Sequence, residues 1–233
     1  MQNDMTHFNN AVELFEREFS HADLVNLLQN GNVVEKQFAT LNLKDLNNED
    51  EAHLLISHLV GVDGKIREAV AFKLVEFIKV KPELFLNVEN FDYFVNGTID
   101  IDGNVCRKVI EASIYLKYSE EFSKYYAEGL NNIIETALDE ISKFTFRDKK
   151  YKINKQIFKI YWCLEAIKYF YEFLPSDKLK NILAECSKLS EYTVREKCAE
   201  IIKHLDLDEE LSKIMYLLEH DENYYVRKVF SNN

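Results

Sequence analysis

The residues best suited to chemistry lie in one segment, residues 144–173, which combines aromatic rings with lysines. Ten of its thirty residues are aromatic: Phe144, Phe146, Tyr151, Phe158, Tyr161, Trp162, Tyr169, Phe170, Tyr171 and Phe173. Its first half is basic, with Asp148 opposed by Arg147, Lys149, Lys150, Lys152, Lys155 and Lys159. Rings beside lysines can stack nucleic-acid bases or bind an acidic peptide. Because aromatic residues at helical spacing usually form core, the other interpretation is a core helix preceded by a solvated basic loop.

Two shorter patterns suggest metal binding but lack an essential feature. Residues 100–104 read Asp-Ile-Asp-Gly-Asn, and Glu111 follows at the twelfth position of a calcium-loop pattern. Such a loop requires glycine at its sixth position, where this chain has Val105. His53 and His58 are five residues apart, which does not place two ligands on one helical face. We therefore expect no metal, no cofactor and no catalytic residue, since phosphate-loop, nucleophile-elbow and paired-cysteine motifs are also missing from the sequence.

The cysteines indicate a reducing environment. Cys106, Cys163, Cys186 and Cys198 fall within helical patterns and show no paired spacing. We expect them to be buried, reduced thiols in a cytoplasmic protein. The polar, acidic start of the sequence is unlike a signal peptide, and no uncharged apolar run reaches the length of a membrane span.

The net charge of −11 disfavours a general nucleic-acid-binding protein. Residues 1–100 contain 17 acidic and 8 basic residues, for a net charge of −9. Residues 101–233 contain 23 and 21, for a net charge of −2. This distribution suits solubility or a basic partner for the first half of the chain.

The elements that would position these residues are helices joined by tight turns. Residues 48–81 predict a helix, a sharp turn at Asp63-Gly64 and a second amphipathic helix from Ile66 to a stop at Pro82. Weaker copies recur, and the first apolar position of each second helix falls at residues 34, 66, 105, 153, 194 and 226. A period of this size indicates stacked helix pairs, each unable to bury its apolar face alone.

The apolar residue and arginine after the turn resemble the start of the second helix of a HEAT repeat. The pattern occurs as Ile66-Arg67, Val194-Arg195 and Val226-Arg227, with Ala71 and Ala199 at the family's small-residue position. The resemblance to the HEAT-repeat (armadillo-like) family implies an all-α, right-handed α-solenoid of stacked antiparallel helix pairs. We expect one such domain over residues 1–233, with residues 6–19 as an N-terminal capping helix. Other copies carry Glu35, Cys106 and Asn154 at the arginine position, so the arginine–aspartate ladder of the family would be interrupted.

The turn ends give a prediction about burial. We expect Ile66, Val105 and Val194 to be buried where paired helices meet, and Arg67 and Arg195 to lie at the turn end as surface pairs. On this basis Ile66→Asp is expected to destabilise the protein far more than Arg67→Ala.

The resemblance also implies that the second helices line a concave face that holds a partner. The off-stripe residues predicted to contact this partner are Lys73, Glu76, Lys108, Glu111, Lys155, Lys159, Trp162, Lys197 and Glu200. Their mixed signs suit a protein or peptide better than a phosphate backbone. The predicted function is a non-enzymatic binding scaffold or adaptor, one version being an acidic inhibitor or immunity-type protein. The alternative is a nucleic-acid-acting enzyme similar to the HEAT-like alkylpurine DNA glycosylases, which would use residues 144–173.

Overall fold

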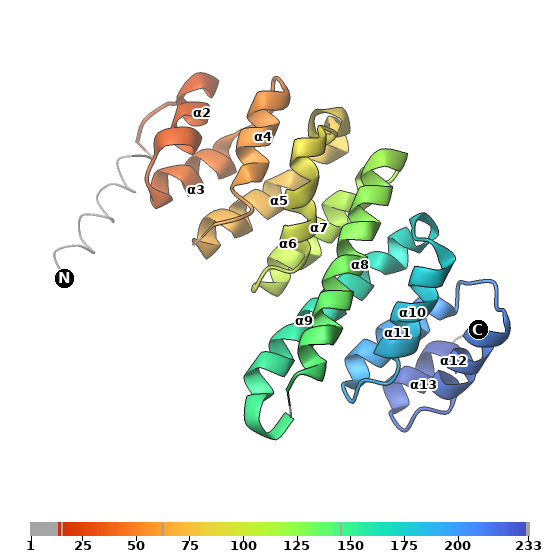
Figure 1. The fold of residues 1–233 in the computed structure, drawn as a ribbon. Coiled ribbons are helices and arrows are strands. Elements are labelled where there is room, and N and C mark those ends of the chain that lie inside the picture. The colour runs from red at the N-terminus through yellow and green to blue at the C-terminus, as the bar shows by residue number, and fades with distance from the viewer. Residues whose placement is uncertain (1–13, 15, 62, 145, 232–233) are drawn as a thin grey trace. The chain divides into compact units, whose positions relative to one another are not determined.

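The computed structural model describes residue 14 and residues 16–61, 63–144 and 146–231, with the backbone alone for 146–149 (Figure 1). These residues form twelve α-helices, and no strand occurs in this part of the chain. The predicted all-α class is therefore confirmed. The chain divides into two compact units, residues 1–116 and 117–233. The prediction of a single domain concerns how these units join, and it stays a prediction.

Unit 1 consists of two rows of helices. Its elements are α2 (His21–Asn30), α3 (Val33–Asn42), α4 (Glu49–Ser57), α5 (Gly64–Val80), η1 (Pro82–Phe85), η2 (Val88–Asn90), α6 (Phe91–Thr98) and α7 (Gly103–Tyr115). α3 packs against α5 and α5 against α7, while α2 packs against α4. We call α3, α5 and α7 the second-helix row of unit 1, because each is the second helix of its pair.

Unit 2 repeats this arrangement. Its elements are α8 (Glu120–Ser142), α9 (Phe146–Phe170), η3 (Tyr171–Phe173), α10 (Ser176–Cys186), α11 (Tyr192–Ile202), α12 (Glu209–Glu219) and α13 (Tyr224–Ser231). α9, α11 and α13 pack in sequence as its second-helix row, and α8, α10 and α12 pack as the first-helix row (Figure 1).

Polar side chains begin the second helices where the turn signals predicted. Asn32, Asp63 and Asp102 cap α3, α5 and α7 by accepting hydrogen bonds from backbone N–H groups of the first turn. Gly61, with φ +156°, supplies a backbone conformation that other residues rarely adopt, just before the turn into α5. α5 then ends at Val80, two residues before Pro82, which disfavours continuation of the helix.

The predicted start of the fourth second helix is wrong. The sequence placed an extended turn and a solvated basic loop before Ile153, whereas α9 begins at Phe146 and runs through the basic stretch. Lysine is a good helix former, and its charged end stays in solvent while its stem covers the helix, so a lysine-rich segment need not be a loop.

The predicted N-terminal capping helix, residues 6–19, falls largely on residues 1–13 and 15, which lie outside the described residues. Residues 17–20 are not helical, so the predicted end of this helix at residue 19 is too late. Phe19 nevertheless packs on the first pair, because its ring meets that of Phe38 edge to face at 5.3 Å between centroids.

The positions predicted to be buried form the core of each unit. Ile66 is 8% exposed, and Val105 and Val194 are fully buried, as expected at the junction of paired helices. None of the described helices is long and apolar enough to span a bilayer.

All four cysteines are buried and unbridged, which confirms that part of the sequence interpretation. Burial raises the pKa of the Cys106 thiol to about 12, with a further contribution from the charge of Asp100. We expect a thiol-specific reagent to label the native protein at least about a hundredfold more slowly than the urea-unfolded chain. Dithiothreitol should leave the melting temperature unchanged. Rapid labelling of a cysteine in the folded protein would show that a core thiol is accessible.

Candidate functional site

In unit 1 the predicted partner-binding residues pair with one another along the second-helix row. On α5, Lys73 Nζ lies 2.6 Å from Glu76 Oε2, and on α7, Lys108 Nζ lies 2.8 Å from Glu111 Oε2. Lys79 of α5, which the sequence analysis did not select, approaches Glu111 Oε1 at 3.5 Å and connects the two helices. These spacings of three residues place both members of each pair on one face of their helix.

Aromatic rings lie beside these paired charges. Lys108 lies over the Phe72 ring at 6.0 Å and Lys79 over the Tyr115 ring at 5.0 Å from the centroid. Phe72 is 50% exposed and Tyr115 40% exposed. Exposed rings held by neighbouring cations offer apolar contact area with little loss of side-chain freedom on binding.

In unit 2 four side chains form a closed ion-pair quartet, Glu165 and Lys168 of α9 with Lys197 and Glu200 of α11. Lys168 Nζ donates to Glu165 Oε1 and to Glu200 Oε2, both at 2.9 Å. Lys197 Nζ donates to Glu200 Oε1 at 2.9 Å and lies 2.8 Å from Glu165 Oε2. Each charge therefore meets two opposite charges, and the quartet joins adjacent helices of the second-helix row.

Partial burial and the hydrogen bonds within the quartet shift the pKa values of three of its groups. Burial disfavours the charged form of Glu200, but hydrogen bonds from Lys197 and Lys168 outweigh it, so its pKa lies below the ordinary value. Burial likewise opposes the charged forms of Lys168 and Lys197, and the hydrogen bonds to Glu165 and Glu200 leave both pKa values raised. Glu200, Lys168 and Lys197 are consequently charged at neutral pH.

We expect Glu200→Gln to lower the free energy of unfolding by about 1–2 kcal/mol at pH 7, since two lysines lose one carboxylate each. A lowered carboxyl pKa contributes stability above the ordinary glutamate value of about 4.3, and this contribution disappears as pH falls through the lowered pKa. The difference between wild type and variant should therefore be smaller at pH 3 than at pH 7. Urea denaturation at both pH values measures it, and an equal difference at pH 3 would contradict a charge-based effect.

The aromatic segment of α9 divides between core and surface. Trp162 is 8% exposed, and two rings cover it edge to face: Phe158 at 6.2 Å and Tyr161 at 5.2 Å between centroids. Phe158 is 36% exposed, and Lys197 of the quartet lies over the Tyr161 ring at 5.5 Å. A partner would therefore meet Phe158 and Tyr161 before Trp162.

Lys155 and Lys159 differ from the other predicted charged residues because neither forms an ion pair with a described residue. Both lie on α9, four residues apart, and Phe158 lies between them in the sequence. Since the remaining lysines of the predicted set are neutralised within the protein, these two carry uncompensated positive charge next to an exposed ring. Three charged residues were not predicted, Glu165, Lys168 and Lys79, because contacts between neighbouring helices join them to the predicted residues.

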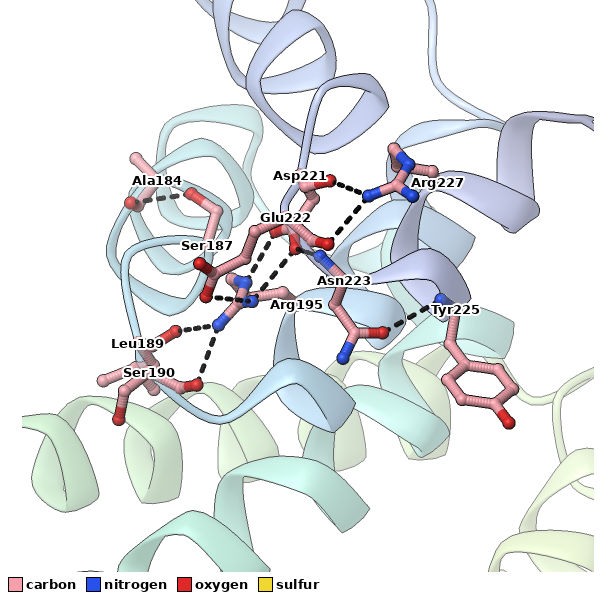
Figure 2. Close-up of polar contacts among 10 residues, drawn as sticks. All are labelled: Ala184, Ser187, Leu189, Ser190, Arg195, Asp221, Glu222, Asn223, Tyr225 and Arg227. Carbon is pink, nitrogen blue, oxygen red and sulfur yellow. Dashed lines mark hydrogen bonds and ion pairs between the residues drawn. The ribbon is translucent and has the colours of Figure 1, made fainter.

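Two buried arginine–aspartate pairs, here called rungs, correct the prediction for the turn ends. Arg67 is 6% exposed; its Nε donates to Asp100 Oδ2 at 2.6 Å and its Nη1 to the Gly61 carbonyl at 2.7 Å. Arg195 is 7% exposed and donates to both oxygens of Asp221, at 2.7 and 3.0 Å (Figure 2). These are therefore not surface pairs, because each aspartate reaches back from the turn of the following helix pair.

The residues of the two candidate metal patterns form hydrogen bonds or ion pairs within the protein. Asp100 belongs to the first rung, and Asp102 caps α7. His53 Nδ1 lies 2.8 Å from Asn90 Oδ1, and His58 Nδ1 lies 2.9 Å from the Leu54 carbonyl. Among the described residues there is no group of three or more histidine, cysteine, aspartate or glutamate side chains able to hold a metal ion.

Comparison with known proteins adds little. No protein-family model matches the sequence, and no curated protein matches it. Among solved structures, the chain is similar to an engineered protein of the Northeast Structural Genomics Consortium at 14% identity and a TM-score of 0.48, covering 92% of this chain and 96% of that one. A second engineered protein from the same consortium gives 12% identity and a TM-score of 0.46, with 92% and 94% covered. Similarities this low carry no argument about family or function.

Proposed function

We propose that each unit is a HEAT-like stack, as in the right-handed α-solenoid expected from the sequence, and that the second-helix rows hold a protein or peptide. The observation that carries this proposal is that, in each unit by itself, paired Lys–Glu charges lie beside exposed rings, along α5 and α7 in unit 1 and along α9 and α11 in unit 2. A charge that is already paired costs less to desolvate than an unpaired one, and rigid rings supply contact area, which suits a polypeptide. The acidic first hundred residues fit a partner with a basic part, as in an inhibitor or immunity-type protein.

A photoreactive amino acid placed at Phe158 tests this proposal in the cells that make the protein. The matched control is Tyr125 of α8, which is 40% exposed on a first helix. We expect one protein adduct from position 158 and none from position 125. Equal adduct formation at both positions would contradict the proposal that the second-helix row binds the partner.

Charge reversal at Lys155 and Lys159 then tests the electrostatic part. With the captured partner purified, the double variant to glutamate should reduce the association rate by about tenfold at low salt, and less at high salt. The matched control is Lys124→Glu on α8, an exposed lysine of the first-helix row. An association rate that depends neither on salt nor on these two lysines would contradict an electrostatic contribution of Lys155 and Lys159 to partner binding.

The same lysines and rings are the basis of the alternative function, an enzyme acting on nucleic acid. The net charge of −11 favours the protein-binding function, because nucleic-acid affinity requires a basic surface. A labelled single-stranded oligonucleotide separates the two. Binding at 150 mM salt that is lost on reversing Lys155 and Lys159 would favour the alternative.

A further inference from the structure

The rungs fill the turn end of the junction between consecutive helix pairs. Arg67 and Arg195 are the fourth residues of α5 and α11, and Nη1 of each binds the carbonyl oxygen six positions earlier. Their Nε and Nη2 groups bind an aspartate of the following pair, Asp100 or Asp221. Arg227 of α13 is half-buried and binds two carbonyl groups of its own turn, and it pairs with no carboxylate among the described residues (Figure 2).

The first junction of unit 1, between the pairs of α3 and α5, lacks both halves of a rung. Glu35 stands at the arginine position and Gly61 at the aspartate position. Glu35 is used locally, because its Oε2 accepts a hydrogen bond from the Asn32 N–H at 2.7 Å in the cap of α3. No described atom lies within 4 Å of the place that a Cβ would take at Gly61. The space beside the missing aspartate is therefore open.

A pocket of about 310 Å³ lies at this junction. Lys36 of α3 and Ser57 and His58 at the end of α4 form its polar wall. Val60, which is 44% exposed, and Ile66 of α5 form its apolar wall. A pocket of this volume is at the small end of those that hold small molecules, and its mixture of a few polar groups with apolar area is typical of them.

Lys36 brings a positive charge to this pocket without a partner of opposite charge. It is half-buried, and it forms no ion pair with a carboxylate of the described residues. Its Nζ lies 3.2 Å from Nε2 of His58, whose Nδ1 lies 2.9 Å from the Leu54 carbonyl oxygen. Because a carbonyl accepts only from an N–H, the proton of the neutral ring is on Nδ1, and Nε2 accepts from Lys36.

The histidine is neutral while the pocket holds no anion. Burial lowers the pKa of His58, and the charge of Lys36 lowers it further. Lys36 and Asp63 are the charged residues that line the pocket beside it. Asp63 caps α5, where its Oδ1 accepts hydrogen bonds from two backbone N–H groups at 2.9 and 3.2 Å. Its charge is therefore already engaged by the helix start.

We infer that this pocket binds a small organic anion, whose carboxylate or phosphate group takes the place of the missing rung aspartate and pairs with Lys36 and His58. An anion at this place accepts from the Lys36 ammonium and favours the imidazolium form of His58, which then donates from Nε2. The apolar part of the ligand covers Val60 and Ile66. The inference uses none of the residues proposed to bind a protein partner, and it stands without that proposal.

The test follows the ring C–H signals of His58 by NMR in the full chain at low salt, while isobutyrate or isobutyl phosphate is added. We expect at least one of the two to bind, which also identifies the headgroup, and isobutyrate to bind about fivefold or more tightly at pH 6 than at pH 8. Isobutyrate stays ionised over this range, so the difference reports on the protein. His58→Gln, which cannot take up the proton, should remove the pH dependence.

Lys36→Met, which keeps the apolar stem, should weaken binding about tenfold or more. The matched control is Lys65→Met, at an exposed lysine of α5 outside the pocket lining, which should leave the affinity nearly unchanged. An unchanged melting temperature of Lys36→Met shows that the loss is not caused by misfolding. The inference is overturned if neither compound shifts the His58 signals at 20 mM, or if Lys36→Met and Lys65→Met weaken binding equally.

Discussion

Arg67→Ala and Arg195→Ala are each expected to lower the free energy of unfolding by about 3–5 kcal/mol, because each leaves a buried aspartate without its partner. The Arg67 and Asp100 side chains are 7% and 8% exposed, and those of Arg195 and Asp221 9% and 8%. Each arginine also satisfies a backbone carbonyl of its own turn. Removal therefore leaves several buried acceptors unpaired, and not the single surface charge that the sequence suggested.

Arg227→Ala is the matched control, since it occupies the same helix position without a carboxylate. We expect it to cost about 1 kcal/mol or less, through lost carbonyl hydrogen bonds at a half-buried site. Urea denaturation of the three variants at pH 7 measures the comparison. Ile66→Asp should now resemble Arg67→Ala in size, because both leave an unpaired buried charge. Losses that are equal for all three arginines would show that the aspartates do not stabilise the rungs.

The turns and the faces of the helices could be predicted because they depend on local chemistry. Asp63-Gly64 and Asp102-Gly103 identify their helix starts through capping and backbone freedom, and both starts are found. Val105 and Val194 are buried because their position after the turn fixes the side that they face. α9 was misplaced because its lysines were interpreted as loop residues, although lysine favours helix.

The rungs could not be read from single repeats because each joins residues 26 or 33 positions apart. A comparison of consecutive repeats could have indicated these pairs. Asp100 and Asp221 each lie five residues before the first apolar residue of a second helix, and in both cases the previous repeat has an arginine. The burial of these arginine and aspartate side chains could not be predicted from the sequence, because it depends on how closely consecutive helix pairs pack.

Part of the candidate site could be predicted because contacts within one helix follow from residue spacing. Lys73–Glu76, Lys108–Glu111 and Lys197–Glu200 are three residues apart, so their pairing on one helical face follows from spacing. Glu165 and Lys168 join Lys197 and Glu200 only through the contact of α9 with α11, which spacing within one helix does not show. Lys155 and Lys159 lie on a helix, α9, as predicted, and whether they bind a partner stays a prediction.

Phe170→Ala is expected to lower the free energy of unfolding by about 3–5 kcal/mol, which is the cost of emptying a buried aromatic site. Phe170 is fully buried at the end of α9, and its ring lies edge to face with Tyr126 at 5.0 Å between centroids. Phe122 of α8 stacks on Tyr126 at 5.4 Å and contacts Phe170 at 6.4 Å. The three rings hold α8 and the end of α9 together, so the cavity left by alanine has large, rigid walls.

Phe158→Ala is the control on the same helix and separates the two interpretations of the aromatic segment. Phe158 is 36% exposed, so its loss should cost about 1 kcal/mol or less in urea denaturation. If Phe158 contacts a partner, the same variant should weaken binding by about tenfold or more, while Phe170→Leu, which fills most of the site, should leave affinity nearly unchanged. Stability effects of similar size for Phe158 and Phe170 would instead assign the whole segment to the core. The aromatic residues of α9 would then give no support to a binding surface, and the proposal for α9 would rest on Lys155 and Lys159 alone.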